Sequence, residues 1–267
     1  MKNSKQIKDE IRKDYARIIT QKSSCCGPST PAKSLAPKLG YSQAELGSVP
    51  ADAATASFGC GNPLALAELK TGEVVLDLGS GAGLDVLLAS QQVGPTGKVY
   101  GLDLTPEMIE EARKNLASAG ITNVEILEGD LEAIPLPEAA VDLVISNCVI
   151  NMAADKKRAF REIFRVLRAG GRFSVSDMVT NHLAPAVREK LPASGCIALA
   201  LEEEDYLGAI RAAGFSEVKV SNRAAFNLSA EGQLLSADCG CGCGDHGSAG
   251  ASSGQVISLT VQGRKGK

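Results

Sequence analysis

The sequence is poor in several residue types that particular kinds of protein need. It has 0 Trp, only 4% aromatic residues and 2 His, which leaves little material for the aromatic side chains that stack bases extruded from nucleic acids. Basic residues are not in excess either, since 28 Lys and Arg stand against 31 Asp and Glu. A nucleic-acid-binding protein is expected to carry a basic face. We therefore expect no nucleic-acid partner.

Long apolar runs are also missing. No stretch reaches the roughly eighteen consecutive apolar residues of a membrane span, and the charged residues 1–15, MKNSKQIKDEIRKDY, contain no apolar core of signal-peptide length. We therefore expect a cytoplasmic protein that does not associate with a membrane. In that compartment structural disulfides are rare, so the 8 cysteines are expected to be reactive or ligand-binding thiols.

What the sequence does contain is organised around residues 73–85, EVVLDLGSGAGLD. A short apolar run leads into Asp77, and glycines 79, 81 and 83 follow, which predicts a strand, a tight turn and the start of a helix. Glycine permits backbone angles that a Cβ forbids, and it lets a ligand lie almost against the main chain. The pattern predicts a site for a nucleotide-like cofactor, with a turn that binds no ligand as the alternative.

Strand-like and helix-like patterns alternate along the rest of the chain, which implies a parallel sheet with helices on both faces and an antiparallel final pair. A helix over residues 1–21 is expected to lie on this domain or over its site, and residues 23–40 are expected to form a loop. The other predicted strands are 98–104, 123–130, 141–147, 172–177, 217–221 and 256–262, and the other predicted helices are 63–69, 108–119, 155–168 and 201–214.

The spacing of the glycine turn favours a cationic cofactor over a dinucleotide. The dinucleotide fingerprint is G-x-G-x-x-G, whose helix N-terminus receives a pyrophosphate. Here the spacing is G-x-G-x-G and Asp77 stands immediately before it. A carboxylate would repel a pyrophosphate, but it suits the sulfonium and ammonium groups of S-adenosylmethionine. The stretch resembles motif I of the class I S-adenosylmethionine-dependent methyltransferases, while a dinucleotide site stays open as the alternative.

This resemblance implies a Rossmann-like, mostly parallel seven-stranded sheet that binds its cofactor at the carboxyl ends of the strands. It implies that Asp103 accepts both ribose hydroxyls, that Asp130 and Leu131 contact the adenine, and that Asn147 lies near the methionine part. The complete set of implied cofactor-binding residues is Asp77, Gly79, Ser80, Gly81, Gly83, Asp103, Leu104, Met108, Asp130, Leu131 and Asn147.

Single cysteines, rather than a motif that clamps a base, mark the acceptor site. After residue 146 the chain reads NCVIN, where enzymes that methylate base amines carry N/D-P-P-Y/F/W, and the Pro-Cys dyad of cytosine C5 enzymes is missing. Cys60 lies in a glycine-flanked loop, Cys148 follows a strand end, and Cys196 lies in a segment expected to cap the site. Cys148 alone reads equally well as a small buried hydrophobe. Three convergent thiolates suit a soft three-coordinate centre, and trivalent arsenic is the candidate.

Several long stretches resemble the arsenite methyltransferase family over roughly residues 41–215, among them GCGNPLALAELKTGEVVLDLGSGAGLDVLLAS and VDLVISNCVINMAADKKRAFREIFRVL. The resemblance implies methyl transfer from S-adenosylmethionine to arsenite, or to its thiol conjugates, in arsenic detoxification. It implies that Cys60, Cys148 and Cys196 bind the arsenic. It also implies that Cys25 or Cys26 supplies the additional thiol of a disulfide relay, with glutathione or a thioredoxin-like protein as the thiol reductant.

We expect four parts along the chain. Residues 1–62 form an N-terminal helix and a cysteine-bearing loop, and residues 63–223 form the methyltransferase core, in which residues 179–215 build the substrate cap. Residues 224–254 form a Gly/Ser/Cys-rich insert that is expected to be flexible, and residues 255–267 form the final core strand and the tail. Within the insert, three thiols are interpreted as accessory metalloid ligands, as a reductant shuttle, or as incidental: Cys239, Cys241 and Cys243.

Two other functions remain open at this stage. A methyltransferase for an ordinary small organic acceptor would use the cysteines only structurally, so its turnover would not change when they are replaced. A non-catalytic metalloid-binding protein would bind arsenite without transferring a methyl group. The intact glycine turn and Asp103 argue against this last function.

Overall fold

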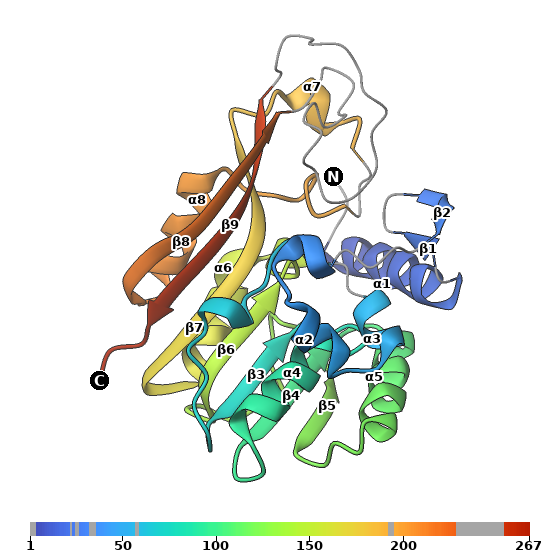
Figure 1. The fold of residues 1–267 in the computed structure, drawn as a ribbon. Coiled ribbons are helices and arrows are strands. Elements are labelled where there is room, and N and C mark those ends of the chain that lie inside the picture. Colours follow the sequence, from blue (N-terminus) through green and yellow to red (C-terminus); the bar gives the residue numbers. More distant parts are fainter. Residues whose placement is uncertain are drawn as a thin grey trace.

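The computed structural model describes residues 4–21, 23–24, 27–31, 36–56, 59–191, 195–227 and 254–267. A seven-stranded sheet with the strand order β5-β4-β3-β6-β7-β9-β8 lies at its centre (Figure 1). Its strands are β3 (Val74–Leu78), β4 (Lys98–Asp103), β5 (Val124–Glu128), β6 (Val141–Asn147), β7 (Leu167–Asn181), β8 (Ser216–Asn227) and β9 (Gln255–Arg264). Pairing is parallel from β5 to β7 and antiparallel where β9 joins β7 and β8. The predicted α/β sheet with an antiparallel final pair is confirmed.

Helices cover both faces of this sheet. Helices α4 and α5 share one apolar core with Val75, and α6 and α8 share the other with Leu76 and Leu78, because neighbouring side chains of a strand point to opposite faces. The helices described are α1 (Ser4–Gln21), α2 (Gln43–Gly47), α3 (Ala51–Thr55), α4 (Leu84–Val93), α5 (Pro106–Ser118), α6 (Lys156–Val166), α7 (Pro185–Arg188) and α8 (Glu203–Ala212), with 3-10 turns η1 (Ala36–Leu39), η2 (Leu64–Leu66) and η3 (Ile150–Met152).

The glycine turn between β3 and α4 has the predicted form. Gly79, Gly81 and Gly83 have positive φ angles of 69°, 52° and 96°, which side chains with a Cβ rarely adopt. A Cβ at Gly79 would also lie 2.6 Å from that of Val149. The Gly79 amide donates to the carbonyl of Leu102 at 2.8 Å, so the turn is fixed against the end of β4.

Two predicted elements differ in extent from the structure around β7. Helix α6 ends at Val166, two residues before the predicted end, and the chain is already extended at Leu167. It continues as β7 because the backbone of Gly170 and Gly171 bonds to that of Lys265 beyond β9. Strand β8 likewise runs to Asn227, past the expected core boundary at residue 223, because β9 pairs with it along this length.

The predicted loop over residues 23–40 contains short regular elements. Two short strands, β1 (Ser23–Ser24) and β2 (Gly27–Pro31), pair antiparallel, and η1 follows. The helix predicted over 63–69 is a single 3-10 turn, η2. The short Ser42–Glu45 capping box that opens α2 is complete, with the Ser42 hydroxyl accepting from the Glu45 amide, so a local signal fixes the start of this helix.

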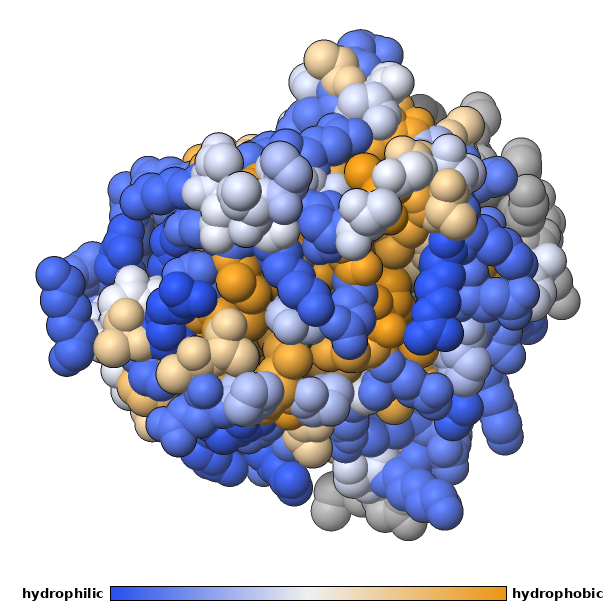
Figure 2. Space-filling model, turned by 90° about the horizontal axis from the view of Figure 1, so that it is seen from below, coloured by the Kyte–Doolittle hydropathy of each residue, from blue (hydrophilic) through white to orange (hydrophobic). Residues whose placement is uncertain are grey.

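The surface of the described part is mostly polar. Leu66 is the only large hydrophobic residue classed as exposed among these residues, at 37%. Seen from below (Figure 2), hydrophilic residues dominate this face and apolar residues show between them near its middle. Within the described ranges, no helix has the length and apolar composition needed to cross a lipid bilayer.

Candidate functional site

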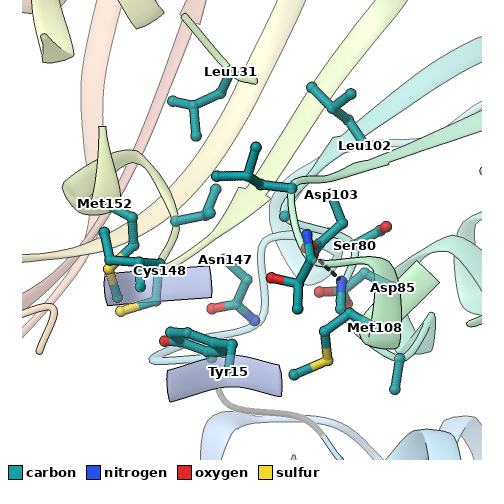
Figure 3. Close-up of a pocket in the computed structure, with 18 of the residues that line it drawn as sticks. Tyr15, Ser80, Asp85, Leu102, Asp103, Met108, Leu131, Asn147, Cys148 and Met152 are labelled. Atoms are coloured by element: carbon teal, nitrogen blue, oxygen red, sulfur yellow. Dashed lines mark hydrogen bonds between the residues drawn. The ribbon is translucent and has the colours of Figure 1, made fainter. Parts of the chain in front are cut away.

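A cavity lies where β3, β4 and β6 end, with α1 as part of its wall, and it encloses about 1040 Å³ of atom-free space, some of it open to solvent. The residues that follow these strands come together here because parallel strands end at one edge of the sheet. Figure 3 shows two sides of the cavity. Tyr15, Asn147, Cys148 and Met152 lie on one side, and Ser80, Asp85, Asp103 and Met108 lie on the other.

Most of the predicted cofactor residues line this cavity, as the sequence interpretation requires. Those that do are Gly79, Ser80, Gly81, Asp103, Leu104, Met108, Asp130, Leu131 and Asn147. Asp77 and Gly83 are not among the lining residues. Asp77 is buried within β3, and Gly83 caps the start of α4.

Three carboxyl groups, of the buried Asp77 and Asp85 and the half-buried Asp103, give this region an excess of acid. Burial raises the pKa of Asp77 well above its ordinary value, and the charges of Asp85 and Asp103 raise it further. Burial raises the pKa of Asp85 to about 6, although a hydrogen bond from Tyr41 opposes the shift. Burial also raises the pKa of Asp103. The amides of Thr105 and Gly81 donate to its carboxyl group at 2.9 Å each and lower this pKa, but by less than burial raises it. A cationic ligand beside these groups would relieve their mutual repulsion.

Asp130 has a partner that the sequence interpretation missed. Lys8 of α1 places its Nζ 2.6 Å from Asp130 Oδ2 and 2.9 Å from Glu132 Oε1. Ile11 and Tyr15 of the same helix also line the cavity. Helix α1 therefore forms part of the cavity wall. The apolar spacing of the helix carried that signal, but nothing in it pointed to Lys8.

Asn147 does more than line the cavity, because its side-chain amide also holds the loop that carries Cys60. Its Oδ1 accepts from the Cys60 amide at 2.9 Å and from the Gly61 amide at 3.2 Å, and its Nδ2 donates to the Gly61 carbonyl at 2.7 Å. From the other side of the loop, the Ser258 hydroxyl donates to the Cys60 carbonyl at 2.8 Å. The loop is thus fixed between β6 and β9.

The three predicted arsenic-binding cysteines meet in one apolar cluster. Cys60, Cys148 and Cys196 pack together, and the Cys148 thiol interacts with each of the other two. Cys148 also lines the cavity, so the cluster is continuous with the cavity. The apolar side chains around the thiols are Met178, Leu183, Val187, Leu191, Ile197 and Val256.

The surroundings keep these thiols protonated. The hydrogen bond with Cys148 lowers the pKa of Cys60, but burial and the charge of Asp177 outweigh it and the net shift is upward. The Cys196 hydrogen bond lowers the pKa of Cys148, but Cys60 and burial raise it well above its ordinary value. The pKa of Cys196 is raised by its bond with Cys148 and by burial. The cluster is therefore electrically neutral near pH 7.

Within the described ranges, no group of three His, Cys, Asp or Glu side chains has the arrangement of a metal site. The three thiols therefore interact in pairs, and they do not already surround a common centre. The remaining predicted thiols, Cys25, Cys26, Cys239, Cys241 and Cys243, lie outside the described residues.

Sequence and structure comparisons agree with this fold. A family model described as a methyltransferase domain matches residues 69–214. The crystal structure of a putative methyltransferase from Bacillus halodurans is 20% identical, with a TM-score of 0.57. The matched region is 77% of this chain and 97% of the Bacillus chain. That likeness shows the fold alone. The fold, the glycine turn and the acidic cavity together define a class I S-adenosylmethionine-dependent methyltransferase.

Two further relatives narrow the class. The arsenite methyltransferase of Halobacterium salinarum is 40% identical over 235 residues, which are 82% of this chain and 60% of the relative. A crystal structure of an arsenic(III) S-adenosylmethionine methyltransferase from Chlamydomonas reinhardtii is 30% identical, with a TM-score of 0.68. The matched region is 87% of this chain and 74% of the Chlamydomonas chain. The chain belongs to the arsenite methyltransferase family. It spans about three-fifths of the length of the archaeal relative.

The residues present fit the cofactor of this class, S-adenosylmethionine. Asp77, Asp85 and Asp103 offer negative charge to its cationic groups. Ser80 has a buried hydroxyl with no hydrogen-bond partner within the described part of the chain, and it lines the cavity. A buried hydroxyl without a partner is costly, so a polar ligand in the cavity gains by pairing with it.

Proposed function

We propose that the protein transfers a methyl group from S-adenosylmethionine to trivalent arsenic bound by Cys60, Cys148 and Cys196. The observation that carries this proposal is the position of Cys148. Its thiol interacts with both other thiols and it lines the cofactor cavity, so an acceptor held by the cluster would face the methyl donor.

The neutral thiols suit the first step of this reaction. Arsenite at neutral pH is the uncharged acid As(OH)₃, and each thiol that displaces a hydroxyl gives up its proton to that hydroxyl, which leaves as water. Three exchanges yield a tris-thiolate arsenic and three waters, with no net change of charge. An apolar shell that raises the pKa of the thiols therefore favours the bound state and does not oppose it.

The chemistry of the second step requires positioning more than acid–base groups. A tris-thiolate arsenic(III) keeps a lone pair opposite the three sulfurs, and S-adenosylmethionine supplies an electrophilic methyl group on its sulfonium. The chain's task is to hold the arsenic with that lone pair about 3 Å from the methyl carbon. The apolar shell also excludes water from the reacting atoms.

The cavity residues have separate roles in holding the cofactor. Asp103 keeps one lone pair free on each carboxyl oxygen beyond its bonds to Gly81 and Thr105, and we assign it the ribose hydroxyls. Asp130 and Leu131 are assigned the adenine. Asp77 acts from behind the cavity wall, through its charge, and Asp85 is added to the cofactor-binding set.

The rest of the predicted function extends this proposal. A disulfide relay through Cys25 or Cys26, served by a thiol reductant of the glutathione or thioredoxin type, would return the arsenic to the trivalent state after each transfer. A role in cytoplasmic arsenic detoxification follows from the same chemistry. Cys239, Cys241 and Cys243 remain candidate accessory ligands.

The decisive experiment incubates the protein with arsenite, a thiol and methyl-labelled S-adenosylmethionine and separates the arsenic species. Labelled methylarsenicals are expected from the parent protein. Cys60→Ser, Cys148→Ser and Cys196→Ser should each lose the product and weaken arsenite binding, while retaining the affinity for S-adenosylhomocysteine, because serine keeps the size of each side chain and no residue assigned to the cofactor is changed. Unmethylated arsenic in the parent, together with serine variants of unaltered arsenite affinity, would refute the proposal.

A further inference from the structure

Tyr41 lies between the cofactor cavity and the Cys60 loop without lining the cavity itself. It follows η1 and is only 3% exposed, packed in the same apolar core as α4. Its hydroxyl donates to Oδ1 of Asp85 at 2.7 Å. Asp85 lies in the first turn of α4 and lines the cavity, so this carboxyl group faces both the tyrosine and the cofactor space.

The other side of the Tyr41 hydroxyl faces Asn147. Nδ2 of Asn147 donates to the Tyr41 oxygen at 3.2 Å, and the remaining groups of this amide bind Cys60 and Gly61. The donors therefore all point one way, from Asn147 to Tyr41 and from Tyr41 to Asp85. These hydrogen bonds determine which end of the Asn147 amide is oxygen. The Tyr41 hydroxyl already donates its proton to Asp85, so its oxygen can only accept, and the group that faces it must be the amide nitrogen.

We infer that Tyr41 is a positioning residue that couples the occupancy of the cofactor cavity to the placement of the Cys60 loop, through Asp85 on one side and Asn147 on the other. The functional consequence rests on the proposed arsenite methylation, since Cys60 is one of the three assigned arsenic ligands. The hydrogen-bonded chain itself is independent of that assignment.

The reason for coupling is the position of Asp85 among other acids. The charge of Asp85 raises the pKa of the buried Asp77, and the charge of Glu45 raises the pKa of Asp85 itself, so neighbouring acids oppose a fixed carboxylate at that place. A cationic cofactor in the cavity offsets this repulsion and holds the Asp85 carboxylate as the acceptor for Tyr41. A charge-assisted hydrogen bond is stronger than a neutral one, so the Tyr41 hydroxyl and the Asn147 amide become more firmly oriented. The loop then presents Cys60 to the other thiols when the methyl donor is present.

The loop offers a matched comparison for this inference. The Ser258 hydroxyl also binds the Cys60 backbone, but it approaches from β9 and has no contact with the cavity. Ser258→Ala and Tyr41→Phe each remove one hydroxyl near the same loop. Only Tyr41→Phe removes the hydroxyl that joins Asn147 to Asp85. The variant leaves the direct effect of the Asn147 amide on the pKa of Asp85, and its ring keeps the packing of the core.

The test measures the rate at which iodoacetamide alkylates Cys60, resolved from the other thiols by peptide mass spectrometry, with and without saturating S-adenosylmethionine and in the absence of arsenic. We expect the ligand to slow alkylation in the parent. The ligand-dependent factor is the alkylation rate without ligand divided by the rate with ligand. In Tyr41→Phe this factor should shrink by about fivefold, the equivalent of one hydrogen bond. In Ser258→Ala the ligand-free rate should rise while the ligand-dependent factor stays at the parent value. Calorimetry would establish that each variant is saturated.

The outcomes separate this inference from the proposed function. If the parent methylates arsenite but Tyr41→Phe keeps the full ligand-dependent factor, the ligand protects Cys60 by steric cover only. That result overturns the coupling and leaves the proposed function standing. A parent that shows the coupling but never methylates arsenite overturns the proposed function alone. Should Tyr41→Phe fail to fold, hydrogen exchange of the Cys60 and Gly61 amides in the parent serves instead. Slowing of both amides that is greater with S-adenosylmethionine than with S-adenosylhomocysteine supports the coupling, and equal slowing, which steric cover alone would give, overturns it.

Discussion

Replacing Gly59 by alanine tests how far the Cys60 loop controls the acceptor site. A Cβ at Gly59 would overlap Nδ2, Cγ and Oδ1 of Asn147, all well inside van der Waals contact. The amide of Asn147 must therefore move or the loop must retreat. Either response disturbs the hydrogen bonds that Asn147 makes with Cys60 and Gly61.

The size of the effect follows from those bonds. Three are at risk, at 2.9, 3.2 and 2.7 Å, and each contributes about 0.5–1.5 kcal/mol net. Their loss amounts to roughly 2–4 kcal/mol, which corresponds to about a 30-fold to 1000-fold change in an equilibrium constant. Because the cost falls on the native position of Cys60, we expect it in the affinity for arsenite.

The assay is equilibrium binding of arsenite to the reduced protein, paired with binding of S-adenosylhomocysteine. The affinity for arsenite should fall by at least about 30-fold in Gly59→Ala, and the cofactor affinity should fall less. Gly208→Ala is the matched control, because a Cβ there meets nothing within 4 Å. Arsenite affinity within twofold of the parent in Gly59→Ala would show that the loop does not place Cys60, and the reasoning would be refuted.

Three further predictions concern stability. In helix α8, Gly208→Ala should stabilise the fold by about 0.5–1 kcal/mol, seen as a higher melting temperature. Asp155→Ala should lower the free energy of unfolding in urea by about 1 kcal/mol, because the Asp155 side chain accepts from the Arg158 amide at the start of α6; an unchanged value would exclude a capping role. Burial alone would raise the pKa of Glu73, but hydrogen bonds from Arg172 and the Lys70 amide lower it below 4.5. The ion pair of Glu73 with Arg172 stabilises the fold above the pKa that Glu73 has in the unfolded chain, and this stabilisation is lost as pH falls through the lower pKa of the folded protein. Arg172→Met should therefore lower the free energy of unfolding by about 2 kcal/mol at pH 7, and by progressively less below about pH 4.5. A cost that does not change with pH would contradict this assignment.

Local patterns predicted most of the fold. The glycine turn and the strand over residues 141–147 lie where the sequence placed them, because each depends on residues close together in the chain. The extent of β8 and β7 could not be predicted in this way. Those strands continue as far as β9 pairs with them, so their length depends on β9 and cannot be predicted from the residues of β7 or β8.

The candidate site divides in a similar manner. The convergence of Cys60, Cys148 and Cys196 could be predicted, because each lies beside an element whose place in the sheet was predictable. The contacts of Lys8 with Asp130 and of Tyr41 with Asp85 join residues 122 and 44 positions apart. They depend on how the N-terminal segment lies across the sheet, which no periodicity or short motif of that segment specifies.

The β8–β9 hairpin fixes where residues 228–253 leave and rejoin the described chain. Asn227 and Asn181 both pair with Gln255, and the next residue, Val256, belongs to the apolar cluster around the thiols. Both ends of the segment that carries Cys239, Cys241 and Cys243 are therefore anchored at the acceptor end of the sheet.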